Sequence, residues 1–400
     1  ADWLLPLVIF GIAGADVALA ALAYRHDIAS TVQVRAIVEP WVISIAAGAL
    51  LFTTVRQDGL IIAYVLSVVA GPAAPIWRLG RNYGLPRDWR PNPAEIMAVA
   101  RRNVPLAAAD AVEWGSRRLD IAILGLFVAP YWVGVYYVAQ QVASLPQKLK
   151  TSFDPILAPV ITQKLVEGDR KAVARQVRQV GFWIIAAQAA IALALGIPGE
   201  AVMGLFGPGG AFVGGTAALA FLLGAEVVAA TAAVSEAALV YVARHRNLLI
   251  SLLLLSVQAA LTVGIIVALD ALEWPADAER RQAFQAAGGA VALTLALGMA
   301  SVLKARLLGR LLDAPVQGWR WSLIWAAAAA VLVGFGFTWL PAALEWAELA
   351  VGVPLILLTF GLVVWTRGFT AEDRALFRLK GDEQPTLPPP GRVVLPRGSK

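Results

Sequence analysis

Long apolar blocks, separated by short polar stretches, run along almost the whole chain. A bilayer core about 30 Å thick is crossed by about 20 apolar residues in a helix, and lipid offers the backbone no hydrogen bonds, so such blocks must be helical. The pattern predicts eleven transmembrane helices, at residues 4–24, 37–55, 59–77, 104–127, 131–161, 180–197, 211–242, 247–269, 283–303, 319–340 and 347–366.

The composition agrees with a membrane protein and argues against a soluble one. Of the 400 residues, 59% are hydrophobic and 15% are charged, whereas soluble domains are about 45–50% apolar and about 25% charged. The predicted fold class is therefore an all-α, polytopic membrane helix bundle. The chain has no cysteine and only two histidines, so disulfides and thiolate metal sites are excluded and we expect no metal or cofactor.

Basic residues are distributed unevenly between the two sides of the predicted bundle. Alternate loops, the helix ends beside them and the C-terminal tail hold 28 of the 33 Lys and Arg residues, and the opposite side holds only Arg56, Arg280 and Arg281. Cytoplasmic loops carry this excess, so these loops are expected in the cytoplasm, in a multi-pass protein of the cell inner membrane. The positive charge is thereby explained without a nucleic-acid partner. The same orientation places Ala1 outside the cytoplasm. We therefore expect that an odd number of helices is missing upstream.

The predicted helix 104–127 carries the most ionisable groups, each costing about 2.5–3.5 kcal/mol inside a membrane. Asp110, Glu113, Arg117 and Asp120 fall within an arc of about 80° if the helix is continuous, and Arg118 lies on the flank. One interpretation is a cavity wall where the arginines meet a phosphate group, because the guanidinium fork suits phosphate. The other is a structural ladder, since Glu113 and Arg117 are an i, i+4 pair.

Three carboxylates on other predicted spans are further candidates for chemistry. Asp16, Glu226 and Glu236 are candidates for coupling to a proton or cation, or for partners of the helix 104–127 arginines. The basic segment 164–179 is expected to form an amphipathic helix on the anionic inner leaflet, with membrane lipids as partners. The Pro-rich residues 384–400 are expected to be disordered.

Residues 117–146, RRLDIAILGLFVAPYWVGVYYVAQQVASLP, carry a family pattern. They resemble the start of the second lobe of polysaccharide-type (Wzx-like) flippases in the multidrug/oligosaccharidyl-lipid/polysaccharide superfamily. The apolar span followed by TAEDRALFR (370–378) also fits. The matching positions are Arg118, Asp120, Ile123, Leu124, Gly125, Val133, Gly134, Tyr136 and Ala139.

The resemblance implies a fourteen-helix, two-lobed protein with both termini in the cytoplasm and its first three helices absent here. A similarity between ALAYRHD (21–27) and ALVYVARHRN (238–247) suggests an internal repeat. The expected divisions are a remnant of the N-terminal lobe, an inter-lobe linker, a six-helix C-terminal lobe, two additional helices and a disordered tail. Their residues are 1–82, 83–103, 104–312, 313–369 and 370–400.

The function that the resemblance implies is translocation of undecaprenyl-pyrophosphate-linked oligosaccharide, an O-antigen or exopolysaccharide unit, by alternating access. Polysaccharide polymerases and glycosyltransferases are expected partners, and the chain is not expected to be an enzyme. Two alternatives stay open: a MATE-like cation-coupled exporter, and a membrane-embedded glycosyltransferase or ligase, which the short external loops disfavour. The expected substrate-binding residues are Asp110, Glu113, Arg117, Arg118 and Asp120.

Overall fold

The computed structural model describes residues 5–24, 33–55, 58–84, 92–116, 118–339, 345–370 and 373–374. These residues form helices joined by turns and short loops, and they contain no strand. The chain divides into two compact units, with the division after Asn103. Each unit is an all-α bundle, as the apolar blocks predicted.

Unit 1 is built around α4, which packs against both α1 and α3. On one side of this arrangement, the Arg78 guanidinium on α4 donates a hydrogen bond of 3.0 Å to the side-chain oxygen of Gln33. Its elements are α1 (Leu5–Tyr24), the π-helix η2 (Gln33–Val38), α3 (Glu39–Leu50) and α4 (Gly59–Tyr83), and α5 (Pro93–Ser116) begins in this unit.

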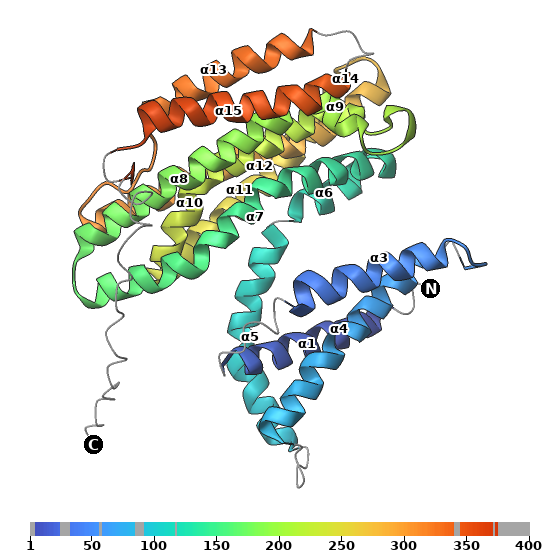
Figure 1. The fold of residues 1–400 in the computed structure, drawn as a ribbon, viewed down its shortest axis with the longest axis vertical. Helices are drawn as coiled ribbons and strands as arrows, with labels where there is room; N and C mark the ends of the chain where they lie inside the picture. Colours follow the sequence, from blue (N-terminus) through green and yellow to red (C-terminus); the bar gives the residue numbers. More distant parts are fainter. Residues whose placement is uncertain are drawn as a thin grey trace. The chain divides into compact units, whose positions relative to one another are not determined.

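Unit 2 contains the remaining long helices, which run side by side in Figure 1. Its principal helices are α6 (Leu119–Phe127), α7 (Pro130–Val166), α8 (Arg170–Gly196), α10 (Thr216–Val242), α11 (Arg244–Ala271), α12 (Ala278–Leu312), α13 (Trp321–Thr338) and α15 (Val353–Val363). Short elements connect them: α9 (Gly199–Gly204), the 3-10 turns Pro208–Gly210 and Val213–Gly215, α14 (Glu345–Ala347), η6 (Glu348–Gly352) and η7 (Val364–Gly368).

Helix α10 lies at the centre of unit 2, packed against α7, α8, α11 and α12. Small residues on α12 allow the close approach, as is common where helices pack inside a membrane. A Cβ atom on Gly288 of α12 would lie 2.5 Å from a side-chain carbon of Ile265 on α11, so only glycine fits there without a shift. The buried small residues on this part of α12 are Ala286, Ala287, Gly288, Gly289, Ala290 and Ala292.

Seven of the described helices are long and apolar enough to cross a membrane. Large apolar side chains are also exposed on their outer surfaces, including Leu249, Leu332 and Leu358, each at least 66% exposed. Water would penalise such an arrangement, and lipid would not. The chain is therefore a membrane protein. The seven segments are Gly59–Arg81, Arg170–Gly196, Val213–Val242, Arg244–Ala271, Ala278–Leu312, Trp321–Thr338 and Glu348–Gly368.

The other four predicted spans stay predictions. Two correspond to α1 and α3, whose apolar stretches are shorter. The third, α7, is long but interrupted by polar residues such as Gln140 and Gln141. The fourth, predicted as one helix over 104–127, is not continuous: α5 ends at Ser116 and α6 begins at Leu119. The neighbouring Gly115 and Ser116 explain the break, since Gly/Ser pairs are common kink sites.

The segment 164–179, predicted as an amphipathic helix on the inner leaflet, is not one helix in the structure. Residues 164–166 end α7, and residues 170–179 are the first turns of α8, continuous with its apolar segment. Val173, Ala174 and Val177 on these turns are buried in the protein core. The apolar side of residues 170–179 therefore packs against other helices, and contact of the segment with membrane lipids stays a prediction.

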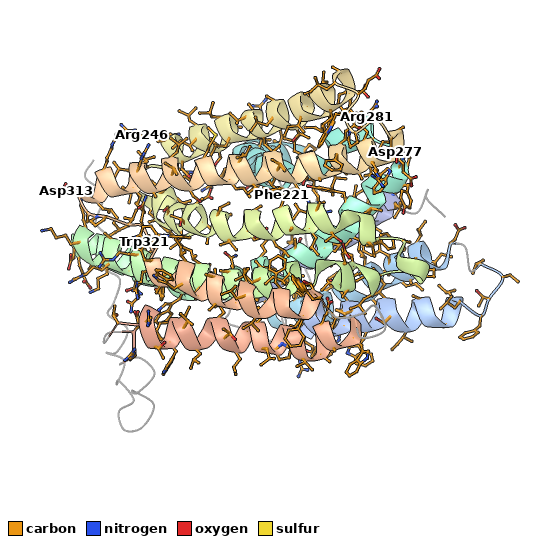
Figure 2. All side chains as sticks on the ribbon, turned by 90° about the horizontal axis from the view of Figure 1, so that it is seen from above. Phe221, Arg246, Asp277, Arg281, Asp313 and Trp321 are labelled. Atoms are coloured by element: carbon orange, nitrogen blue, oxygen red, sulfur yellow. The ribbon has the colours of Figure 1, made fainter. Side chains whose placement is uncertain are left out.

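The ends of unit 2 differ in charge. Figure 2 shows Arg246 and Asp313 at one end of the unit, with Asp277 and Arg281 at the other. The end with Arg246 also contains the start of α8, whose first turns carry Arg170, Lys171, Arg175 and Arg178. We call it the basic end, and it is the end that the sequence predicts to face the cytoplasm.

Candidate functional site

The first polar cluster joins α6 to α7 around Asp120, which is 1% exposed. The Tyr136 hydroxyl donates a hydrogen bond to Asp120 Oδ2, and Gln140 Nε2 donates another to the same oxygen at 3.1 Å. The backbone N–H of Ile121 donates to Asp120 Oδ1 at 2.9 Å. Tyr136 and Gln140 lie one turn apart on α7, so both reach one carboxylate. Because both carboxylate oxygens are buried and hydrogen-bonded, Asp120 links α6 to α7 and presents no surface to a ligand.

Arg118 lies outside this buried cluster. It precedes the first residue of α6 with a non-helical backbone (φ −124°, ψ −1°), and its side chain is exposed. The guanidinium carbon lies 5.9 Å from the centre of the Tyr137 ring, within cation–π range. Arg118 forms no ion pair with any residue that the structure describes. Its exposed guanidinium is therefore accessible at the start of α6.

The predicted polar stripe does not survive as a single helix face. Asp110 and Glu113 lie on α5, Asp120 lies on α6, and Arg117 falls outside the described residues. Because the helix is interrupted between Ser116 and Leu119, a constant rotation of about 100° per residue cannot relate the two halves. Of these residues, the structure brings only Asp120 into described side-chain contacts, and it places Arg118 beside the same helix pair.

A second cluster connects α10, α11 and α12 around Lys304, a residue that the sequence placed in a cytoplasmic loop. The loop assignment was wrong, because Lys304 lies within α12 and is 5% exposed, whereas its cytoplasmic side stays a prediction. Its ammonium pairs with Glu236 Oε2 at 2.9 Å and donates to Ser251 Oγ at 3.0 Å. Asn247 Nδ2 donates to Glu236 Oε1 at 3.1 Å. The apolar pattern continuing past Lys304 to Leu312 could have indicated its place inside the helix.

The two other carboxylates predicted for ion coupling lie elsewhere. Asp16 is exposed on α1 in unit 1, and Glu226 is half-buried on α10. Both make interactions within the protein. Their proposed role in coupling stays a prediction. Among the described residues, no three His, Cys, Asp or Glu side chains are grouped so as to hold a metal ion.

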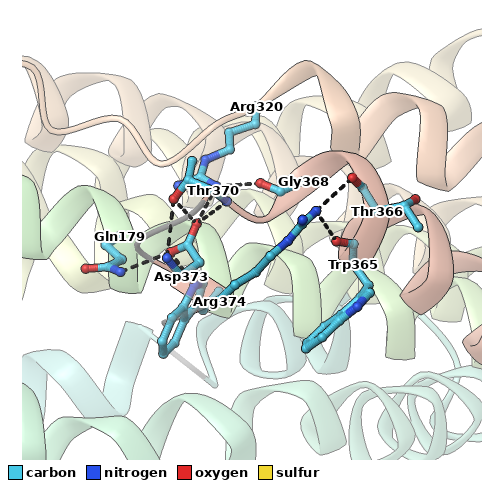
Figure 3. A network of polar contacts seen from close by, with 9 residues as sticks. Gln179, Arg320, Trp365, Thr366, Gly368, Thr370, Asp373 and Arg374 are labelled. Carbon is cyan, nitrogen blue, oxygen red and sulfur yellow. Dashed lines mark hydrogen bonds and ion pairs between the residues drawn. The ribbon is translucent and has the colours of Figure 1, made fainter. Parts of the chain in front are cut away.

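The third cluster lies at the basic end and surrounds Asp373, which is fully buried. Figure 3 shows Arg320, Gln179 and Thr370 converging on its carboxylate. Arg320 Nη1 lies 2.8 Å from Asp373 Oδ2, and Gln179 Nε2 donates to Oδ1 at 3.0 Å. Trp183 Nε1 also donates to Oδ1, at 3.2 Å. The contacts join α8, the residue before α13 and the start of the tail.

The local sequence explains how Asp373 is presented. Thr370 N donates to Asp373 Oδ2 at 2.9 Å, while Asp373 N donates to Thr370 Oγ1 at 3.4 Å. Such reciprocal bonds between residues three apart form a capping box, with Asp in place of the usual Glu. Arg374 donates to the carbonyls of Trp365 and Thr366 at 3.0 Å each. Thr370, Asp373 and Arg374, in the segment predicted as the start of a disordered tail, thus contact the helix bundle, and the rest of that segment lies outside the described residues.

Charge compensation makes the Asp373 cluster stable as an ion pair. Burial alone would raise the pKa of the Asp373 carboxyl, but hydrogen bonds from Arg320, Thr370 and Gln179 outweigh it and hold the pKa well below its ordinary value. The Arg320 guanidinium carbon also lies 3.8 Å from the centre of the Phe182 ring. This cluster was not predicted from the sequence, although the T-x-x-D spacing after the last apolar span is typical of a capping box.

Comparison of the chain with protein-family models and with curated proteins returned no match. The fold is that of a polytopic membrane helix bundle, and its function is inferred from its own residues.

Proposed function

We propose that the chain is a transporter that moves undecaprenyl-pyrophosphate-linked oligosaccharide across the cell inner membrane by alternating access. One observation carries the proposal. Three positions of the flippase-like pattern meet at the α6–α7 junction: Asp120 accepts a hydrogen bond from Tyr136, and Arg118 lies at the start of the same short helix. Ala139, a fourth position of the pattern, is fully buried in the same region. These positions of the pattern thus lie together at one helix junction.

Within this proposal, Arg118 and Asp120 have different roles. Asp120 is a positioning residue, because its carboxylate is buried and its oxygens are occupied by Tyr136, Gln140 and Ile121. Arg118 is the substrate-binding residue, because its guanidinium is exposed at the break between α5 and α6. A guanidinium can donate two parallel hydrogen bonds to a phosphate, which suits a pyrophosphate linkage. Arg117 is the second candidate, on the basis of the sequence.

Complementation of a bacterial strain that lacks its own polysaccharide flippase tests the proposal. Arg118→Ala or Arg117→Ala is expected to lower surface polysaccharide more than tenfold at unchanged membrane abundance. Arg118→Lys should restore part of it, because the charge returns without the fork. Arg367→Ala, which removes an exposed arginine from η7, is the control and should leave polysaccharide unchanged. Full activity in both alanine variants would refute the assignment.

A cation-coupled exporter is the second candidate, and the Glu236–Lys304 cluster favours it. The Glu236 side chain is 42% exposed although it pairs with a buried lysine. The side-chain amide of Asn247 donates to Glu236 through its nitrogen. Its oxygen, Oδ1, is buried and has no hydrogen-bond partner in the described structure. Transport of a fluorescent organic cation into vesicles, with and without a proton or sodium gradient, separates the candidates. Uptake abolished by Glu236→Gln but retained by Arg118→Ala would favour the exporter.

A further inference from the structure

A pocket of about 460 Å³ opens at the basic end of unit 2, between the first turns of α8 and the segment that follows α12. Three cationic side chains line it from α8: Lys171, Arg175 and Arg178. They lie three and four residues apart, so they fall within an arc of about 60° on the helix surface. All three are exposed, and none forms an ion pair with a described residue.

The opposite wall is held in place by the fold and does not depend on a ligand. Asp313, Ala314 and Pro315 form this wall. A few residues later, a Cβ atom on Gly318 would lie 2.4 Å from Phe182 N and 2.9 Å from Arg178 O, so this segment lies directly against the α8 backbone. Val316 between them is 3% exposed and belongs to the core. The pocket is therefore part of the packed structure of unit 2.

The pocket lies at the depth where lipid head groups are found. Arg178 is the last basic residue of α8, and the uninterrupted uncharged stretch that follows, 180–196, spans about 26 Å as a helix, close to a bilayer core. On the other wall, Trp319 and Trp321 follow shortly after Pro315 and are 54% and 74% exposed. Tryptophan at a helix end is typical of the membrane–water interface. The pocket thus opens where the hydrocarbon ends.

We infer that this pocket binds the phosphodiester head group of an anionic phospholipid. Three converging cations supply the charge, and basic pockets between transmembrane helices are known lipid head-group sites. The two acids of the lining reduce the net charge without blocking the site, since Asp169 accepts a hydrogen bond of 2.9 Å from Ala172 N as the cap of α8 and Asp313 ends α12. The volume exceeds the needs of a bare phosphate ion and fits a glycerophosphate group. The inference is independent of the transported substrate.

Lipid-dependent stabilisation of the detergent-purified full chain tests the inference. Phosphatidylglycerol should raise the midpoint of thermal unfolding, phosphatidylcholine should not, and inorganic phosphate should be ineffective at the same concentration. In the triple variant Lys171→Gln/Arg175→Gln/Arg178→Gln, the phosphatidylglycerol concentration for half of the effect should rise at least tenfold. The matched control removes three exposed arginines from the same end outside the pocket, as Arg244→Gln/Arg246→Gln/Arg367→Gln, and should change that concentration less than twofold.

The single variant Arg175→Gln repeats the test if the triple variant is poorly expressed, with an expected increase of about threefold, and Arg175→Lys should restore tight binding. Equal phosphatidylglycerol dependence in the pocket and control variants would overturn the site. Equal stabilisation by phosphatidylglycerol and inorganic phosphate would overturn the lipid as its ligand. None of these measurements records transport, so their outcome is separate from that of the complementation experiment.

Discussion

The two ion-pair clusters of unit 2 bury opposite partners. In the Glu236–Lys304 pair the lysine side chain is 6% exposed and the glutamate 42%, whereas in the Arg320–Asp373 pair the acid is 1% exposed and the arginine 27%. The first pair joins three helices along the bundle, and the second closes the basic end. The partner with access to water can be rehydrated when its counterion is removed, but the buried partner cannot.

The two buried charges also differ in the number of groups that contact them. Asp373 accepts hydrogen bonds from Arg320, Gln179, Trp183 and Thr370, so its charge is compensated from several elements. Among the described residues, Lys304 contacts Glu236 and Ser251 through its ammonium. Removal of the exposed partner is expected to be the more damaging change in both pairs, because it leaves a buried charge behind. The loss is expected to be larger for Asp373 than for Lys304, because Asp373 is more deeply buried and its remaining neutral donors do not replace the cation.

Arg320→Gln is expected to have the largest effect, because it leaves Asp373 buried without its cation. Breaking a buried pair from one side costs about 3 kcal/mol. SDS-induced unfolding of the purified protein measures the loss, and Arg367→Gln is the control with an exposed arginine. The double variant Arg320→Gln/Asp373→Asn should recover part of the loss, since the stranded charge is gone. A double variant less stable than Arg320→Gln would contradict this account.

Glu236→Gln is expected to cost less, about 2 kcal/mol, because Ser251 still accepts a hydrogen bond from Lys304. Lys304→Met should cost about 1 kcal/mol, since a methionine of similar length fills the space and Glu236 can be hydrated. The same unfolding assay measures both. If Lys304→Met were the more damaging change, the half-exposed glutamate would not be the sensitive position and the comparison would fail.

The pH dependence of the free energy of unfolding should reveal the contribution of Asp373, the buried carboxylate at the basic end. The pKa of Asp373 is lowered in the folded protein, so its contribution is complete above the unfolded value of about 3.9 and is lost as pH falls toward the folded value. The stability difference between the native protein and Asp373→Asn should be constant from pH 7 to pH 5. It should shrink by about 1 kcal/mol by pH 3. A difference independent of pH over this range would argue against an ionised Asp373.

The smallest effect is expected at an exposed pair that serves as the reference for both clusters. Lys164 Nζ lies 2.6 Å from Glu167 Oε2, but the two side chains are 39% and 43% exposed. Such surface pairs contribute less than about 0.5 kcal/mol because water screens them. Lys164→Gln should therefore unfold with a midpoint close to that of the native protein. A loss comparable to that of Glu236→Gln would show that exposure does not rank these pairs.

The sequence alone determined the all-α class and most of the helices, because a membrane span requires a minimum apolar length and an internally hydrogen-bonded backbone. The spans beginning near Gly59, Arg244 and Trp321 agree with the structure within a few residues. The resemblance to flippases also pointed to Arg118, Asp120 and Tyr136 as residues of one motif. It could not show that Asp120 and Tyr136 share a hydrogen bond, since helical periodicity relates residues within one helix only.

Only the tertiary structure decided which charges are buried and paired. Lys304 looked like a loop residue because a positive charge next to an apolar block usually ends a span, and its burial depends on Glu236 from another helix. Arg320 and Asp373 are 53 residues apart, and nothing in local sequence ties them together. The physical reason is the same in each case: an ion pair is set by the approach of helices distant in sequence, whereas the helices themselves are set by the local pattern of apolar residues.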